Sequence, residues 1–547
     1  MKYLNLNIST KTIFAGALGL LLFTASCEKD LEREPITEVT SASVYKDFAN
    51  YPKALGKVYA GVAIGGQSGG DGNADVAGID GGFSSYMRQL YTMQVITTDE
   101  AVIGWNDGNL PDMHKMTWNS SNEFIGAFYY RVYNVIAVAN EFIRNTSDER
   151  LAANGITGAN ATEAKYMRAE ARFLRAQAYY HALDLFGNVP FVLETDPAGE
   201  LPKRIVRADL FKFVESELKA LETELKDPKT NEYGRADKAA AWTLLSRLYL
   251  NAKVYSGSER NNDVITYANK VIGAGYELKK QTIQVPDPDN PGQTKPKDIS
   301  YESLFLADNH LNNPEVILSV NYDGIKTQTF GGSTFLVRAS VGGEMNAADF
   351  GINGGWGGIR TTKAFVNKFT DPADKRGRFF TQGQTLEITD LGDFKSGYAF
   401  IKYKNVTSTG AKGSHAAGDF VDTDIPMYRL ADVYLMYAEA TLRGGNGSRA
   451  TALGYINALK TRAGAATISD ADLTLDYILD ERARELSWEY TRRTDLIRYG
   501  KFTSASYLWP WKGGVKDGKG VQEFRNLFPI PAADITANRN LVQNPGY

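Results

Sequence analysis

Three glutamates near the carboxyl end of the chain have a spacing that could serve catalysis by paired carboxylates. Glu481, Glu485 and Glu489 follow one another at intervals of four, which on a continuous helix places them on one face. Retaining glycosidases use two carboxyl groups about 5 Å apart. A general acid needs a raised pKa, however, and nearby arginines keep acids ionised. We therefore expect an ion-pair lattice that stiffens a helix, formed with Arg482, Arg484, Arg492 and Arg493.

Motifs for metal or nucleophilic chemistry are absent from the sequence. Asp71 and Asp75 copy the first alternating acids of a calcium loop, but Val76 replaces the required glycine and Gly82 stands where the bidentate glutamate belongs. A glycine-rich turn is the better interpretation of this stretch. There is no G-x-S-x-G elbow and no phosphate-binding loop. We expect no cofactor, although structural calcium bound elsewhere by loop oxygens is left open. The four histidines form no H-E-x-x-H pair; they are His114, His181, His310 and His415.

Aromatic residues beside amide and charged side chains are the remaining chemical signal. A sugar ring offers an apolar face and a rim of hydroxyls, so a sugar site combines a flat aromatic ring with amide, carboxylate or guanidinium groups. The loop 103–109 supplies both parts. The alternative is that Trp105 only anchors its own loop, and residues next to β-type runs, among them Tyr322, are core candidates. The predicted ligand-binding residues are Trp105, Asn106, Asn109, Asp80, Arg88, Trp356, Tyr301 and Phe330.

The amino terminus has the pattern of an export signal. Lys2 and Lys11 precede an apolar run from Ile13 to Phe23, which is too short to span a bilayer, and small residues lead to Cys27. Because this is the only cysteine in the chain, a disulfide within the chain is excluded. We predict a signal peptide at 1–26 and lipidation of Cys27, so that acyl chains anchor a mature protein of residues 27–547.

The amino-acid composition indicates which classes of protein the chain can belong to. The chain has 547 residues, 43% hydrophobic and 23% charged, with a formal net charge of −3. Such a balance gives no indication of a nucleic-acid partner or of a disordered chain. The 30 tyrosines, 26 phenylalanines and 7 tryptophans exceed what a core of this size needs. This excess favours a binding surface rich in aromatic rings.

Amphipathic helices account for most of the chain. Ala169, Phe173, Ala176, Tyr180 and Leu183 recur at helical spacing and alternate small with large side chains, as in stacked tetratricopeptide-like units. A Gly-, Thr-, Asn- and Asp-rich segment, about 276–425, interrupts these helices with short β-type runs. The sequence therefore predicts a mostly α fold, a tetratricopeptide-like helical repeat scaffold with long irregular loops and short β segments. Other helices are expected at 119–146, 205–226, 241–252, 430–442, 449–463 and 472–499, with Trp242 and Trp488 as packing residues.

Three stretches of the sequence, taken in this order, form a specific set of motifs. The first is the helical run from Arg168 that ends in Leu-Phe-Gly-Asn-Val-Pro190. The second consists of residues 424–440, 481–486 and 493–500. The third is the ending, Phe528-Pro-Ile-Pro531 followed by 540–547. Together with the export signal, these stretches resemble the SusD/RagB family of outer-membrane lipoproteins of Bacteroidetes, and the resemblance spans the whole chain.

The resemblance implies a lipid-anchored protein on the outer face of the outer membrane. Such proteins hold an oligosaccharide or polysaccharide for a SusC-like TonB-dependent transporter, without catalysis, and a glucan such as starch or laminarin is the preferred ligand. Scaffold motifs do not identify the glycan, because sites on a shared fold vary. Two alternatives stay open: a surface glycoside hydrolase that uses Glu481 to Glu489, and a scaffold that binds only protein.

Overall fold

The computed structural model describes residues 41–66, 69–70, 74–197 and 199–547. The predicted signal peptide and the predicted lipidation site Cys27 lie outside these residues, as does Asp71. Among the residues described, no helix is both long enough and apolar enough to cross a membrane.

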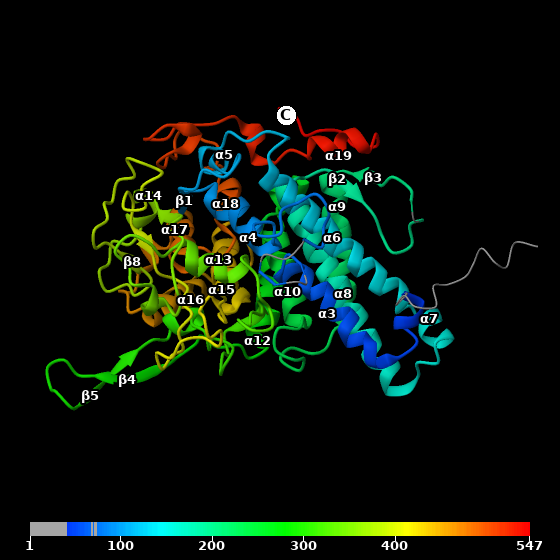
Figure 1. Cartoon of the computed structure of the whole chain (residues 1–547), viewed down its shortest axis with the longest axis horizontal. Helices are drawn as coiled ribbons and strands as arrows, with labels where there is room; N and C mark the ends of the chain where they lie inside the picture. Colours follow the sequence, from blue (N-terminus) through cyan, green and yellow to red (C-terminus); the bar gives the residue numbers. More distant parts are fainter. Residues whose placement is uncertain (1–40, 67–68, 71–73, 198) are drawn as a thin grey trace, which may run out of the picture.

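A stack of antiparallel helices forms the body of the protein, as the helical periodicity predicted (Figure 1). Consecutive long helices pack against one another: α3 and α8 on α6, then α9 on α8, α10 on α9, and onward to the carboxyl-terminal pair. The stack consists of α3 (Tyr51–Ala63), α6 (Glu123–Asn145), α8 (Gly158–Leu185), α9 (Arg207–Glu224), α10 (Lys238–Leu250), α12 (Asn261–Gly273), α15 (Leu430–Leu442) and α16 (Arg449–Arg462).

Shorter helices connect and cover this stack. They are α2 (Ser41–Val44), α4 (Tyr86–Tyr91), α5 (Pro111–Lys115), α7 (Asp148–Ala153), α11 (Ala252–Ser256), α13 (Gly332–Ala339), α14 (Lys363–Val366), α17 (Leu475–Glu485), α18 (Arg492–Arg498) and α19 (Ala532–Ala537). Single turns of tighter or wider helix are η1 (Phe48–Asn50), η2 (Thr92–Ile96), η3 (Glu302–Phe305), η4 (Ala347–Phe350), η5 (Asp470–Asp472), η6 (Lys512–Gly514) and η7 (Glu523–Asn526).

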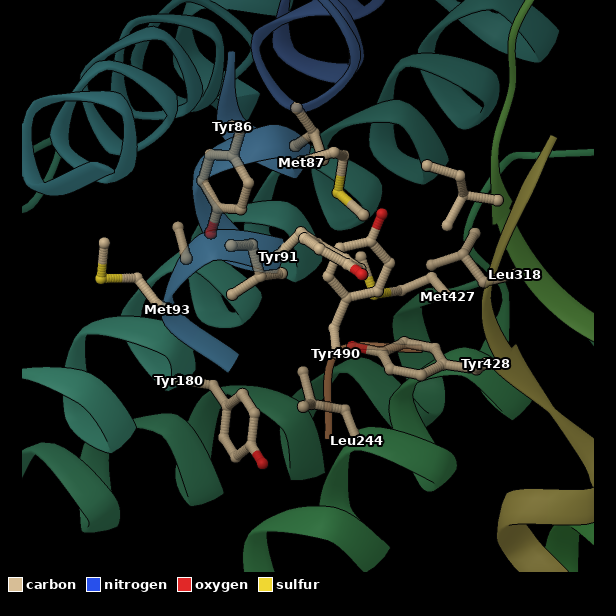
Figure 2. Packing of buried hydrophobic residues seen from close by; sticks show 14 of the residues in the cluster. Tyr86, Met87, Tyr91, Met93, Tyr180, Leu244, Leu318, Met427, Tyr428 and Tyr490 are labelled. Carbon is tan, nitrogen blue, oxygen red and sulfur yellow. The ribbon is translucent and has the colours of Figure 1, made fainter. Parts of the chain in front are cut away.

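The alternation of small and large side chains explains how these helices approach each other. On α8, Ala169, Ala176 and Ala182 are fully buried, so the neighbouring helices come close, while Phe173 and Leu183 fill the space between the alanines. Tyrosines and methionines from several helices meet at the centre of the core, where Tyr86, Tyr91, Tyr180 and Tyr490 surround apolar residues (Figure 2).

Strands occur as two-stranded antiparallel ladders in the part of the chain that the structure describes. The pairs are β1 (Ala101–Ile103) with β7 (Ile359–Thr361), β2 (Val189–Phe191) with β3 (Lys203–Ile205), β4 (Thr282–Pro286) with β5 (Thr294–Asp298), β6 (Val316–Val320) with β10 (Ile425–Arg429), and β8 (Phe379–Phe380) with β9 (Ala399–Phe400). The β4–β5 hairpin projects from the body (Figure 1). The β6–β10 pair joins a strand inside the loop-rich segment to the residues that follow its carboxyl end.

The continuous helix expected at 472–499 is not present. The chain forms α17 and α18 with a turn between them, in which Trp488 and Tyr490 have left-handed backbone angles, φ 60° and 66°. Glu489 lies in that turn, so the three glutamates do not share one helix face. Trp488 is 1% exposed and packs in the core, which confirms its predicted structural role; Trp242 on α10 also packs against the core.

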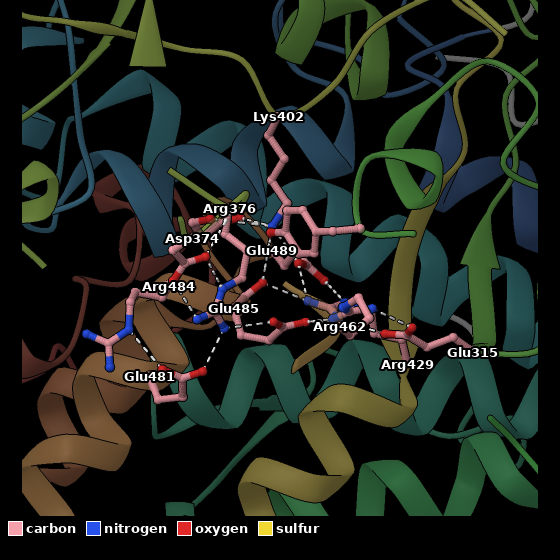
Figure 3. A network of polar contacts seen from close by, with 12 residues as sticks. Glu315, Asp374, Arg376, Lys402, Arg429, Arg462, Glu481, Arg484, Glu485 and Glu489 are labelled. Atoms are coloured by element: carbon pink, nitrogen blue, oxygen red, sulfur yellow. Dashed lines mark hydrogen bonds and ion pairs between the residues drawn. The ribbon is translucent and has the colours of Figure 1, made fainter. Parts of the chain in front are cut away.

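A buried network of charges between several segments takes the place of the ion-pair lattice expected along one helix (Figure 3). Arg429, at the end of β10, lies 2.6 Å from Glu485, 2.7 Å from Glu489 and 2.9 Å from Glu315. Arg376 pairs with Asp374, Glu481 and Glu485, and Lys402 lies 2.6 Å from Glu489. Among the arginines expected beside these glutamates, Arg484 does pair with Glu481, whereas Arg482 and Arg492 pair with other acids.

Glu481 and Glu485 stay ionised because each of them faces more than one cation. Burial alone would raise the pKa of Glu485, but Arg462, Arg429 and Arg376 outweigh burial and hold that pKa well below its usual range. The same balance lowers the pKa of Glu481. A buried charge is tolerated when it is paired, and removing one partner leaves the others uncompensated.

We predict that Arg429→Ala lowers the free energy of unfolding by about 3–5 kcal/mol, because it leaves Glu489 and Glu485 short of a buried cation. Urea unfolding measures the loss. Arg449→Ala is the matched control: its partner Asp470 is 64% exposed, so the change should cost at most about 1 kcal/mol. Equal effects of the two substitutions would contradict a dominant role for the buried network.

We also predict a loss of stability in acid that depends on Glu439. Burial would raise the pKa of Glu439, but Arg498 and Arg443 lower it from 4.5 to about 2. The folded pKa lies below the unfolded pKa, so the contribution is present above pH 4.5 and is lost as the pH falls towards 2. That difference corresponds to roughly 3 kcal/mol.

Urea unfolding at several pH values between these limits tests this acid dependence. Glu439→Gln should flatten the fall in unfolding free energy, whereas Glu232→Gln, at a carboxylate that is 80% exposed, should leave it unchanged. An unchanged slope in Glu439→Gln would refute the assignment.

Candidate functional site

The pairing of β1 with β7 brings two tryptophans together from distant parts of the chain. Ile103 is opposite Ile359, and the Gly104 amide donates to the Gly358 carbonyl at 2.9 Å. Trp105 follows β1 and Trp356 precedes β7, so both lie at the same end of the ladder. Their ring centroids are 6.2 Å apart, and Trp105 Nε1 donates to the Trp356 carbonyl at 3.2 Å.

Glycines in the run 354–358 make this contact sterically feasible. A Cβ atom on Gly358 would lie 2.4 Å from the Trp105 ring, and one on Gly355 would lie 2.1 Å from the Val341 carbonyl oxygen. Any larger side chain at Gly358 would push Trp105 aside. The run is thus a closely packed support for Trp356 and Trp105.

Phe330 adds a third ring to the pair. It lies in the loop between β6 and α13, and its centroid is 5.8 Å from that of Trp356 with the planes inclined at 74°. Phe420, which is 9% exposed, stacks on the other side of Phe330 at 5.3 Å. We call the half-buried rings of Trp105, Phe330 and Trp356 the aromatic face. Phe420 supports this face from the side.

Two arginines hold the aromatic face in position. Arg88, on α4, donates to the Gly82 and Phe330 carbonyls at 3.2 and 3.3 Å, and its guanidinium lies 5.6 Å from the Trp105 ring centroid. Burial lowers the pKa of Arg88 to about 10, although Asp107 and Asp80 oppose the change. Arg338, on α13, lies 5.1 Å from the Trp356 ring centroid. Both arginines remain charged at neutral pH.

The polar residues predicted to bind the ligand differ in how far their side chains are engaged in hydrogen bonds within the protein. Asp80 is exposed, and its Oδ1 accepts from the Gly82 and Phe83 amides. Asn106 is exposed and forms no hydrogen bond within the described residues. Asn109 accepts from the Glu123 amide at 3.1 Å and donates to Ser121 at 3.4 Å, so it fixes the loop to the start of α6. These bonds give Asn109 a structural role, and its contact with a ligand stays a prediction.

Tyr301 does not belong to the site. It is 2% exposed and donates to the Glu485 carbonyl at 3.2 Å, within the buried charge network. Tyr322, 5% exposed, is likewise buried, and its hydroxyl donates to the Ala63 carbonyl. The core position that the sequence favoured for Tyr322, next to a β-type run, is confirmed. Tyr301 was also predicted to bind the ligand, and its burial contradicts that prediction.

The tertiary structure adds residues that sequence reasoning missed, namely Arg338, Phe335 and Phe420. Phe335 is buried beneath Trp105 at 6.1 Å and beneath Arg88 at 4.6 Å. The hydrophobic spacing within α13 could have indicated that Phe335 is buried. Nothing in the sequence indicates that Phe420, 90 residues after Phe330, would stack on it.

The three glutamates considered for catalysis cannot reach a polysaccharide. Glu481, Glu485 and Glu489 are at most 4% exposed, and each is paired with a cation. Over the described parts of the chain, no group of three or more histidine, cysteine, aspartate or glutamate residues could hold a metal ion. The aromatic face, with exposed Asp80 and Asn106 at its edge, is instead suited to bind a ring with an apolar face and a polar rim.

Comparison with known proteins gives consistent matches. Residues 382–547 match the family model described as "SusD family", and residues 81–250 match one described as "Starch-binding associating with outer membrane". The chain is 34% identical to "Starch-binding protein SusD" from Bacteroides thetaiotaomicron, over 98% of this chain and 99% of that protein.

Solved structures show the same fold. A SusD homolog from Bacteroides thetaiotaomicron has a TM-score of 0.68 at 19% identity and covers 93% of this chain and 99% of its own. "Surface glycan-binding protein A" from Bacteroides fluxus has a TM-score of 0.66 at 19% identity and covers 91% of this chain and 99% of its own. The mostly α architecture predicted from the sequence is therefore confirmed.

We predict that Trp356→Ala weakens the binding of an oligosaccharide about five- to 150-fold, because by analogy with base stacking an aromatic contact is worth about 1–3 kcal/mol. Titration calorimetry measures the change. Trp511→Ala is the matched control, since Trp511 is also a half-buried tryptophan and lies outside the aromatic face. Equal affinities of the two variants would move the site elsewhere.

Proposed function

The chain belongs to the SusD family, and from this premise we propose that the protein is a cell-surface glycan-binding lipoprotein that delivers its ligand to a SusC-like TonB-dependent transporter. The aromatic face is the observation that supports the proposal. It joins three half-buried rings, two charged arginines and two exposed polar side chains, Asp80 and Asn106.

The shape of the aromatic face favours a curved glucan. The planes of Trp105 and Phe330 are inclined to that of Trp356 by 55° and 74°, so the three rings do not form one flat surface. A helical glucan presents sugar faces that turn along the chain, whereas a flat, extended glucan presents parallel faces. The name of the 34% identical relative, a starch-binding protein, points to the same class. We propose starch-type α-glucan as the first ligand to test, with laminarin second.

Binding without catalysis is part of the proposal. A glycoside hydrolase would need an accessible pair of carboxyl groups, and the pair that the sequence offered is buried in ion pairs. At the aromatic face, Asp80 is the nearest predicted acid, and its Oδ1 is engaged by two backbone amides.

We predict that native gels containing starch retard the protein and that gels containing a flat β-glucan, such as a cellulose derivative, do not. Long incubation of the protein with starch should release no reducing sugar. The soluble form from residue 28 onward serves as the sample. Trp356→Ala should abolish the retardation, while Trp511→Ala keeps it. No retardation in any glycan gel would favour a scaffold that binds only protein. Released oligosaccharides would overturn the binding-only proposal.

We predict that the protein fractionates with the outer membrane through Cys27, the single cysteine at the end of the export signal. Cys27→Ser should move the protein to the soluble fraction and remove labelling by a palmitate analogue, because the acyl chains supply the membrane affinity. A variant that stays in the membrane and keeps the label would refute the anchor.

A further inference from the structure

A pocket lined mainly by charged side chains lies where the projecting β4–β5 hairpin joins the body of the protein (Figure 1). Its volume is about 420 Å³, within the range of small-molecule sites. No residue of the aromatic face lines it. We call it the cationic pocket, because its charged lining consists of the cations Lys297, Lys375, Arg378 and Lys404 and the acids Asp298 and Glu302.

Lys404 brings an ammonium group without a partner to the cationic pocket. Its Nζ forms no hydrogen bond or ion pair with any residue that the structure describes. Burial lowers the pKa of Lys404, and the charges of Arg378 and Lys297 lower it further. Glu302 and Asp349 oppose this shift without cancelling it. Lys404 is only half-buried and lines the pocket, so a bound anion can reach it and offset the repulsion from the other cations.

The two acids of the cationic pocket do not neutralise its cations. Asp298 accepts from Lys375 at 2.6 Å, and Glu302 accepts from Arg378 at 2.6 Å. Lys297 Nζ lies 3.8 Å from Glu302, which is beyond hydrogen-bonding distance. Burial would raise the pKa of both acids, but these cations lower it, so both acids are ionised at neutral pH. Four cations in the lining therefore share two negative charges.

The unused hydrogen-bond donors of the pocket indicate which anion fits. An ammonium group has three N–H donors, and Lys375 uses one of them for Asp298. Lys297 and Lys404 donate to no group among the described residues. The three lysines come from β5, from the loop before β8 and from the segment after β9. A tetrahedral phosphate or sulfate has oxygens on several sides and can accept from donors that approach from different segments, whereas a carboxylate has two oxygens in one plane.

Backbone hydrogen bonds hold two of these lysines in place. The Lys404 amide donates to the Phe305 carbonyl at 3.0 Å, and the Thr423 hydroxyl donates to the Lys404 carbonyl at 2.7 Å. The Lys375 amide donates to the Ala463 carbonyl at 2.9 Å. The backbone of the pocket is therefore formed before a ligand arrives, which reduces the ordering cost of binding.

We propose that the cationic pocket binds a phosphate or sulfate group through the ammonium groups of Lys297, Lys375 and Lys404. Arg378 adds positive charge, while its Nη2 is engaged by Glu302. The group can belong to a free inorganic ion or to an ester on a small molecule, since both present the same oxygens. A neutral glucan has no such group, so this site differs from the aromatic face in both place and ligand.

Titration calorimetry of the folded protein with inorganic phosphate, and with inorganic sulfate, at low ionic strength tests the proposal. We expect saturable binding that weakens as sodium chloride is added. Lys404→Met keeps the length of the side chain and removes its charge, and it should weaken binding about ten- to 150-fold, as expected for a hydrogen bond to a charged group. The absence of saturable binding of both anions would overturn the proposal.

Lys326→Met is the matched control, because it makes the same change in net charge outside the pocket. Lys326 is 82% exposed and lies 3.9 Å from Asp323. Phosphate affinity should be unchanged in this variant. Equal losses in Lys326→Met and Lys404→Met would show attraction to the overall charge of the protein, and would overturn a defined site.

Lys297→Met tests the pocket without a change in packing, since Lys297 is 55% exposed. We expect a loss of phosphate affinity of about two- to fivefold, because an exposed ion pair contributes little, and an unchanged thermal midpoint. In the wild-type protein, phosphate should raise the midpoint above that in chloride of equal ionic strength, and Lys404→Met should remove this increase. Unchanged phosphate affinity in Lys297→Met would overturn the proposed set of ligating lysines.

Glucose 6-phosphate and glucose distinguish the two sources of the anion. Tighter binding of glucose 6-phosphate than of inorganic phosphate would identify an ester as the ligand, and equal or weaker binding would identify the free ion. Glucose should not bind the pocket, and glucose binding that is lost in Lys404→Met would overturn the proposal. Starch retention should be unchanged in Lys404→Met, so failure here is distinguishable from failure of the proposed function.

Discussion

The contact between Arg429 and Glu485 is the interaction on which most of this structure depends. Arg429 ends β10 and Glu485 ends α17, and the same two side chains reach Glu315 before β6, Arg376 in the loop-rich segment and Arg462 on α16. Five segments separated by up to 170 residues therefore meet at one buried cluster. Each charge in it requires the others, because none is accessible to water.

This cluster fixes the position of β6, and through β6 it positions one part of the aromatic face. β6 pairs with β10 next to Arg429. The chain then leaves β6 through a loop that is fixed to α3, because the Tyr322 hydroxyl donates to the Ala63 carbonyl, and reaches Phe330 on the aromatic face. The position of Phe330 therefore depends on a strand that the buried charges hold in place.

The aromatic face is rigid for a physical reason that bears on affinity. Trp105 is held by a hydrogen bond to Trp356, by its contact with Gly358 and by the ring of Phe335 beneath it. Arg88 joins the Phe330 loop to the turn at Gly82. Ordering these side chains during folding removes an entropic cost that binding would otherwise have to meet. A surface of this kind suits capture of a ligand that must later be released, since it needs no conformational change.

The sequence by itself determined the helical scaffold, because helix formation depends on local periodicity, and it proposed Asp80, Arg88, Trp105, Phe330 and Trp356 as ligand-binding candidates, because aromatic and polar residues concentrate in glycine-rich loops. It could not decide which of these residues meet. The β1–β7 pairing joins positions more than 250 residues apart, and Phe420 stacks on Phe330 from 90 residues further along the chain. Tyr301 was misassigned for the same reason, because its burial comes from tertiary packing. Helical period is local, whereas burial and pairing depend on residues far away in the chain.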